Sequence, residues 1–114
     1  MNMEAKKHIG IKEYLYLKQL LKTYAHIVEM SDDSPLVKEM FKGTGHAISN
    51  IVDMLDITSI DYLPLEQLIR SGDIYLNNYR RVKGAPSRAY WKGAYDEIVD
   101  LIKYFFDIEL RRDI

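Results

Sequence analysis

Two pairs of carboxylates have a spacing that could support metal-dependent chemistry on phosphates. Glu29 precedes Asp32 by three residues, and Glu97 precedes Asp100 by the same interval. Side chains three apart share a helix face, and Mg²⁺ sites that act on phosphates need several oxygen ligands that converge from neighbouring elements. A Glu-x-x-Glu pair that would complete such a site does not occur. The pairs are therefore more typical of solvated helix faces than of a hydrolase.

The histidines, glycines and hydroxyl residues give no stronger signal for catalysis. No His follows a Glu by three residues, the spacing of metal sites in helical bundles, and the lack of Cys excludes thiolate sites. The segment 42–46 (Lys-Gly-Thr-Gly-His) lacks the spacing of a phosphate-binding loop. No Gly-x-Ser-x-Gly motif occurs. The sequence predicts a protein that is not an enzyme and binds no metal or cofactor.

One segment has an unusual charge. Between residues 80 and 92, five basic side chains occur without an acidic one, and the only Trp lies among them. Arg and aromatic side chains are preferred anchors of protein interfaces. We predict a partner-binding site formed by Arg80, Arg81, Lys83, Arg88, Tyr90 and Lys92. The alternatives are a solvated corner without a function and a surface that binds nucleic acid through its phosphates.

Hydrophobic residues recur at helical spacing in four segments, of which two lie in the first half of the chain. The first segment spans residues 11–30. The second begins at Pro35, after Ser34 as N-cap, and extends to about residue 55. Gly43 and Gly45 each cost up to about 1 kcal/mol in a helix, so we expect a kink or short break there. Residues 56–63 are predicted to form a connection, since Pro64 disfavours helical geometry before it.

The third and fourth helices are expected to meet at a stop signal. The third covers residues 65–82, with Ser71-Gly72-Asp73 as a candidate break. Gly84 and Pro86 form the stop, and Ser87 is expected to cap the fourth helix, which extends to about residue 111. The pattern predicts an all-α protein, a mostly antiparallel four-helix bundle that forms a single domain over residues 1–114.

The composition narrows the class of protein. The chain has 114 residues, 47% of them hydrophobic, and a net charge of −1, as in ordinary globular proteins. No stretch resembles a signal peptide or a membrane span, so we expect a cytoplasmic protein that does not bind membranes. Residue types with A/T-rich codons are frequent, which favours an origin in a low-GC bacterium or its phage.

These observations predict a small non-enzymatic protein-binding module, such as an inhibitor, immunity factor or regulator. In general character only, the chain resembles small helical bacteriocin immunity proteins, antitoxins and phage-encoded inhibitors. A nucleic-acid-binding accessory protein that uses residues 80–92 is the alternative. A homodimer is a further candidate, because the apolar face of the fourth helix is wider than one neighbour can cover and ends in Phe105, Phe106, Ile108 and Leu110.

Overall fold

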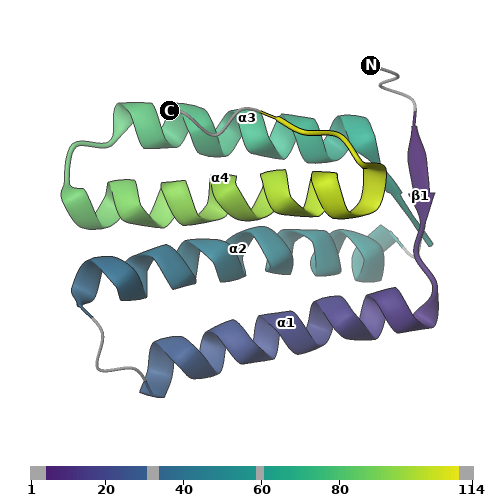
Figure 1. Ribbon diagram of the computed structural model, residues 1–114, viewed down its shortest axis with the longest axis horizontal. Coiled ribbons are helices and arrows are strands. Elements are labelled where there is room, and N and C mark those ends of the chain that lie inside the picture. Colours follow the sequence, from purple (N-terminus) through teal and green to yellow (C-terminus); the bar gives the residue numbers. More distant parts are fainter. Residues whose placement is uncertain (1–4, 31–33, 59–60, 111–114) are drawn as a thin grey trace.

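A computed structural model describes residues 5–30, 34–58 and 61–110 (Figure 1). Within these ranges it contains four α-helices, which are α1 (Ile11–Met30), α2 (Pro35–Thr58), α3 (Leu65–Arg81) and α4 (Ala85–Phe106). Two short strands accompany them, β1 (Lys6–His8) and β2 (Tyr62–Pro64). The helices pack against one another, so the prediction of an all-α four-helix bundle is confirmed.

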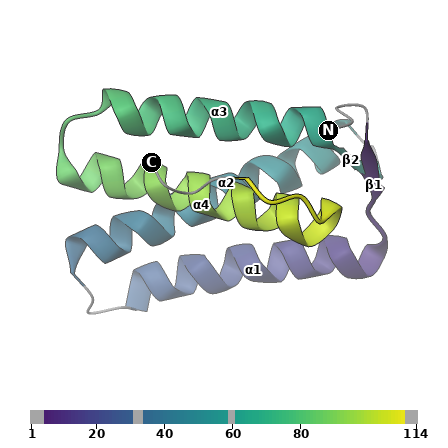
Figure 2. The same ribbon diagram turned by 45° about the horizontal axis from the view of Figure 1, so that its top comes forward.

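The four helices do not pack at the corners of a regular square, as they would in a symmetric four-helix bundle. Each helix runs antiparallel to the next one in the chain, so α2 and α4 run in the same direction (Figure 1). This parallel pair makes the most extensive contact in the molecule, while α3 packs on α4 and α1 packs on α2. Figure 2 shows α1 and α3 on opposite sides of the pair. Contact between α2 and α4 therefore separates α1 from α3.

Two glycines allow α2 and α4 to approach so closely. A Cβ atom at Gly43 would overlap the backbone carbonyl of Tyr90 and lie 2.7 Å from its carbon atom. A Cβ atom at Gly93 would lie 2.9 Å from the carbonyl carbon of Met40. The short break considered at Gly43 and Gly45 does not occur, because α2 continues through both residues. Tight packing against α4 offsets the low helix propensity of glycine there.

The core lies mainly between α2, α3 and α4. Its fully buried side chains include Ile48, Leu65, Leu68, Ile98 and Ile102. By contrast, Leu17 is the only buried residue of α1. Four of the eight large hydrophobic side chains that are exposed in the described residues also belong to α1, and they are Ile11, Leu15, Tyr16 and Met30. The first helix is therefore the least embedded of the four.

A two-stranded antiparallel sheet holds the start of α1 to the segment before α3. Lys6 pairs with Pro64 and His8 pairs with Tyr62. Backbone hydrogen bonds from the Ile9 amide to the Asp61 carbonyl, 2.7 Å, and from the Leu65 amide to the Ala5 carbonyl, 2.9 Å, extend the pairing on both sides. The sequence did not predict these strands, and it placed residues 62 and 63 in a connection.

Several helix ends differ from the prediction. Gly84, not Ser87, is the N-cap of α4, and Pro86 lies in its first turn, where its missing N–H has no cost. The helix ends at Phe106 rather than near residue 111, because Asp107 adopts the left-handed conformation, with φ of 57°. Helix α3 is continuous through Ser71, Gly72 and Asp73, so a break there is wrong.

The residues at the end of α4 and directly after it cover part of the core. Phe105 is buried, and Phe106, Ile108 and Leu110 are partly buried against the core. These are the four side chains on which the expectation of a homodimer rested, and all four pack within their own chain. Among the described residues, no helix is both long and apolar enough to span a membrane.

Candidate functional site

Four of the predicted partner-binding residues gather at the junction of α3 and α4. Arg80 and Arg81 occupy the last turn of α3, and Lys83 follows in the turn; all three are exposed. The guanidinium of Arg88, in α4, lies over the ring of Tyr79, 4.3 Å from its centroid. A cation over an aromatic face is held there electrostatically. We call Arg80, Arg81, Lys83 and Arg88 the basic corner.

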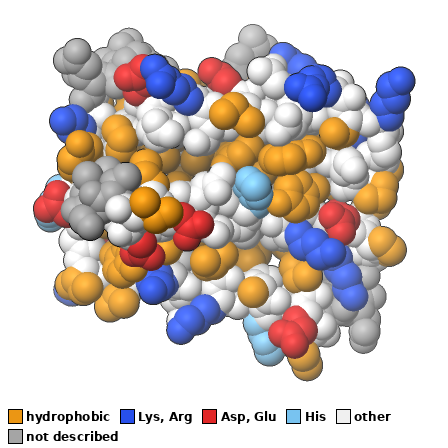
Figure 3. Space-filling model, turned by 180° about the vertical axis from the view of Figure 1, so that it is seen from behind, with side chains coloured by type: hydrophobic (Ala, Val, Ile, Leu, Met, Phe, Trp, Pro, Cys, Tyr) orange, Lys and Arg blue, Asp and Glu red, His pale blue; other side chains and the backbone are white. Residues whose placement is uncertain are grey.

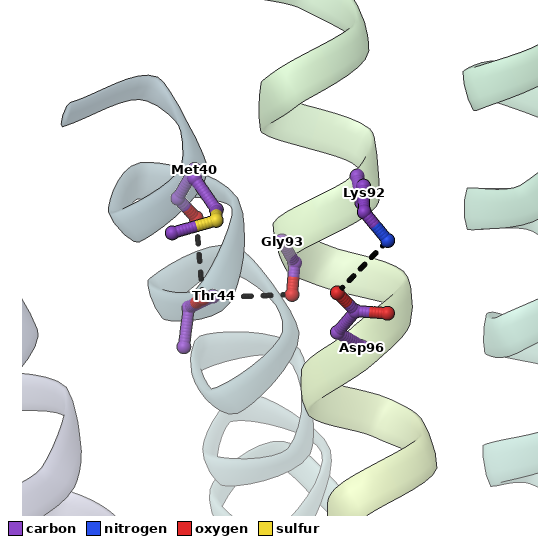
Figure 4. Close-up of polar contacts among 5 residues, drawn as sticks. All are labelled: Met40, Thr44, Lys92, Gly93 and Asp96. Atoms are coloured by element: carbon purple, nitrogen blue, oxygen red, sulfur yellow. Dashed lines mark hydrogen bonds and ion pairs between the residues drawn. The ribbon is translucent and has the colours of Figure 1, made fainter. Parts of the chain in front are cut away.

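The other two predicted residues point elsewhere. The ammonium of Lys92 lies 3.3 Å from a carboxylate oxygen of Asp96, one turn further along α4. Figure 4 shows this pair on the side of α4 that faces away from α2. Tyr90 is half-buried, and its hydroxyl lies 2.7 Å from Nδ1 of His46 in α2. The six residues predicted as one site therefore divide into three groups. Four form the basic corner, Lys92 forms an ion pair within α4, and Tyr90 contacts α2.

Tyr90 belongs to a cluster of four rings from three helices. The His46 ring centroid lies 5.6 Å from that of Tyr75, 5.7 Å from that of Tyr90 and 5.4 Å from that of Trp91. Trp91 stacks on Tyr75 at 5.9 Å. The side-chain amide of Asn50 donates to the Tyr75 hydroxyl at 2.8 Å. Edge-to-face and stacked rings at these distances attract one another, so this aromatic cluster connects α2, α3 and α4.

The close approach of the backbones positions the cluster. Gly43 meets the carbonyl of Tyr90, which places His46, one turn later in α2, beside the Tyr90 ring. Thr44 adds a polar contact across the same interface. Its hydroxyl donates to the Met40 carbonyl at 3.1 Å and lies 3.5 Å from the Gly93 carbonyl, as Figure 4 shows. The glycines that enable the helix contact therefore also define the geometry of the rings.

Burial gives the cluster a defined protonation pattern. Desolvation raises the pKa of Tyr90, and the charge of Glu39 raises it further, so the hydroxyl retains its proton. Desolvation lowers the pKa of His46 from its ordinary value of 6.5. The neutral imidazole can accept a hydrogen bond from Tyr90 at Nδ1, and its ring proton then lies on Nε2. His46 thus acts as a neutral aromatic residue at pH 7.

We expect folding stability to decrease on acidification because of His46. Its folded-state pKa lies below 6.5, so its contribution is fully present above the unfolded value and is lost as pH falls through the folded value. An NMR titration of the imidazole should give a midpoint below 6.5. Replacing His46 by Gln should flatten the dependence of the unfolding free energy on pH in this range. An unchanged slope would contradict the assignment.

Beside the aromatic cluster, an open groove of about 520 Å³ lies between α1 and α2. Its α1 wall is apolar and consists of Leu21, Tyr24, Ala25 and Val28. The remainder comes from α2 and α4 and consists of Phe41, Lys42, Gly45, His46, Ser49, Asn50 and Tyr90. On the face seen in Figure 3, apolar side chains form a band across the molecule, with a His among them and basic side chains near its edges.

The lack of a side chain at Gly45 keeps the groove open. A Cβ atom there would meet only Leu21, at 3.9 Å, so the packing around Gly45 accommodates a side chain, unlike that around Gly43. Tyr24 lies on the opposite wall, and its ring centroid is 5.9 Å from that of Phe41. Burial raises the pKa of Tyr24, and the carboxylates of Glu97 and Asp100 in α4 raise it further. The carboxylate pair considered for metal chemistry therefore lies near a tyrosine.

No metal centre is evident in the described part of the chain, where no three His, Asp or Glu side chains gather in a group that could hold an ion. Asp32, from the other carboxylate pair, lies outside the described residues. Sequence reasoning identified Tyr90 but missed His46, Gly45 and the rest of the groove. The small residues at 43 and 45 were the available signal, and they were interpreted as helix breakers. Comparisons with known protein families, curated proteins and solved structures find no match for this chain.

Proposed function

We propose that this protein is a small non-enzymatic module that binds another protein, with the groove at the centre of its binding surface. The observation that carries the proposal is the groove itself, a volume of about 520 Å³ open to solvent between α1 and α2. Concave, mainly apolar surfaces with a few polar groups are typical of binding sites. The roles that fit such a module are those of an inhibitor, immunity factor or regulator, and we propose that it acts in the cytoplasm.

The residues around the groove support a protein as the ligand. Tyr90 and His46 border it, and Trp91 lies directly behind them in the cluster. Rigid aromatic side chains lose little conformational entropy on binding and are enriched among the residues that contribute most to interface affinity. Since the ring contacts already hold these side chains in place, the partner would meet a preorganised surface.

Nucleic acid is the second candidate ligand, and the basic corner favours it. Arg80, Arg81 and Lys83 are exposed, and no described carboxylate lies within 4.0 Å of their cationic groups. Binding through several phosphates would depend steeply on salt, with losses of orders of magnitude between about 50 and 200 mM. The apolar groove has no role in such a complex, so we rank this function second.

Affinity capture with groove variants tests the proposed function. The tagged protein would be incubated with lysate of the organism that encodes it and washed at low and high salt. We expect a protein that remains at high salt, is captured equally by Gly45→Ala, and is lost with Gly45→Phe, which fills the groove. Ala25→Arg, at an exposed position on the opposite wall, provides a second blocking variant. Nucleic acid that elutes at high salt, with no groove-dependent protein, would support the second candidate instead.

A further inference from the structure

The groove and the basic corner meet near the start of α4, where Tyr90 borders the groove and Arg88 belongs to the basic corner. His46 lines the groove and contacts Tyr75 and Trp91. Tyr75 and Tyr79 lie one turn apart on α3, and Tyr79 carries the guanidinium of Arg88 on its ring. Lys83 lies two residues before the start of α4 at Ala85, and from Ala85 to Tyr90 the helix rises only about 7.5 Å. A ligand in the groove therefore needs to extend by only a few residues to reach the basic corner.

The groove and the basic corner differ in whether their cationic side chains are paired with carboxylates. At the rim of the groove, the ammonium of Lys42 is paired with Glu39 at 2.9 Å. In the basic corner, Arg80, Arg81 and Lys83 have no described carboxylate within 4.0 Å. These cations also lie at the carbonyl end of α3, where the helix dipole favours positive charge. Among the described residues, the surface thus offers apolar contacts at one end and positive charge without a paired carboxylate at the other.

We propose that the partner contributes an acidic amphipathic segment, whose apolar side chains enter the groove and whose carboxylates face the basic corner. This inference rests on the proposed function, since it names the chemistry of the protein ligand. Helices that bind in grooves present apolar anchors at positions i, i+3, i+4 and i+7. A helix of about 16 residues is about 24 Å long, which fits within the 37 Å long axis of the molecule.

The combination of features favours an acidic segment over nucleic acid. A phosphate backbone would contact the cations but leave the groove walls, including Leu21, Val28 and Phe41, without a partner. Carboxylates on a peptide can pair with Arg in a bidentate geometry, while leucine or aromatic side chains of the same peptide bury apolar area in the groove. Only a ligand of this mixed chemistry uses both ends of the surface.

Selection from a random peptide library tests the inference without knowledge of the natural partner. Peptides of about 16 residues, displayed on phage, would be selected on the full chain. We expect enriched peptides to carry net negative charge and apolar residues at helical spacing. The affinity of the best synthetic peptide would then be measured by fluorescence anisotropy. Reversal of Arg80, Arg81 and Lys83 to Glu should weaken binding at least about tenfold, because opposite charges across an interface become like charges.

A matched variant controls for net charge. Lys6, Lys7 and Lys12 are also exposed and lie near the strand end of the molecule, opposite the α3–α4 turn (Figure 1). Their reversal to Glu changes the net charge equally and should alter affinity by less than about twofold, since distant charges are screened by salt. Gly45→Phe should weaken binding at least about tenfold, because apolar anchors contribute much of the affinity at an interface.

The results distinguish failure of the acidic-segment proposal from failure of the proposed protein-binding function. Enrichment of neutral or basic peptides, no enrichment, or equal effects of both charge reversals would overturn the acidic segment. If Gly45→Phe still abolished capture of a cellular protein, the proposed function would nevertheless stand. A single-stranded oligonucleotide that binds through the basic corner, with no effect of Gly45→Phe, would assign the corner to nucleic acid. Circular dichroism of every variant would verify its fold.

Discussion

Replacing Gly43 or Gly93 by Ala is expected to lower the free energy of unfolding by about 3 kcal/mol, the upper part of the range for overpacked sites. The physical reason is contact with backbone rather than with a flexible side chain. A methyl group at either position would meet the carbonyl of the facing helix, so relief requires α2 and α4 to separate. Such a separation would loosen the most extensive helix contact in the molecule.

Gly45→Ala is the matched control for this prediction. It lies in the same helix two residues from Gly43, but its Cβ would meet only Leu21, at an ordinary distance of 3.9 Å. Because Ala has the higher helix propensity, we expect Gly45→Ala to stabilise the protein by up to about 1 kcal/mol. Urea unfolding monitored by circular dichroism would measure all three variants. Equal effects at 43 and 45 would show that helix propensity, not interhelical contact, determines the cost.

The same variants report on the aromatic cluster. Gly43 contacts the backbone of Tyr90, whose hydroxyl lies 2.7 Å from His46. Separation of the helices should therefore expose Trp91, the only Trp in the chain, and shift its fluorescence emission to longer wavelength. Under the same conditions Gly45→Ala should leave the emission unchanged. We therefore expect a substitution that loosens the contact between α2 and α4 to disturb the aromatic cluster as well.

Ile98→Ala is expected to cost about 2–5 kcal/mol, as large-to-small substitutions do at buried sites. Ile98 is fully buried in α4, and one of its methyl carbons lies 3.3 Å from the Cβ position of Gly72 in α3. Truncation would leave a cavity between two helices that are already closely packed. Neighbouring side chains have little room to fill it, because α4 lies between α2 and α3.

Ile74→Ala provides the control for the loss of Ile98. Ile74 lies in α3 and is 57% exposed, so its truncation removes little buried apolar area and should change the unfolding free energy by less than about 0.5 kcal/mol. Chemical denaturation at fixed pH would compare the two variants. A cost at Ile98 no greater than the cost at Ile74 would contradict the placement of α4 at the centre of the bundle.

The helical elements could be predicted from local chemistry because the signals lie within a few residues of each other. Apolar spacing identified all four helices, and Pro35 marked the position at which α2 begins. Gly84 was predicted as part of the stop before α4, and the structure makes it the N-cap of that helix. The glycines in α2 could not be interpreted this way, since Gly43 is compensated by a helix about 50 residues further along the chain. Helix propensity gives only the local free-energy cost of a glycine in a helix. Whether the helix continues through that glycine depends on its tertiary contacts.

The strands and the groove depend on contacts that no local pattern records. Strand β1 is the short, exposed segment Lys-Lys-His, and only its pairing with residues 62–64 makes it a strand. The groove combines residues from α1, α2 and α4, so neither its lining nor its volume follows from a single helix. The basic corner was predictable, since Arg80, Arg81 and Lys83 are close in sequence and no acidic residue lies between positions 80 and 92.

The strand pair holds one end of α1, so a rotation of the helix around that end would displace its other end most. Its first residue lies two positions after Ile9, whose amide donates to the Asp61 carbonyl, whereas Val28, near its other end, borders the groove. A helix of 20 residues is about 30 Å long, so a tilt of about 5° around the strand end moves the far end by roughly 2.5 Å. Leu17 is the only fully buried residue of α1, and Leu20, Leu21 and Tyr24 are packed against the core only in part. A rotation of this size around the strand end would change the width of the groove between α1 and α2.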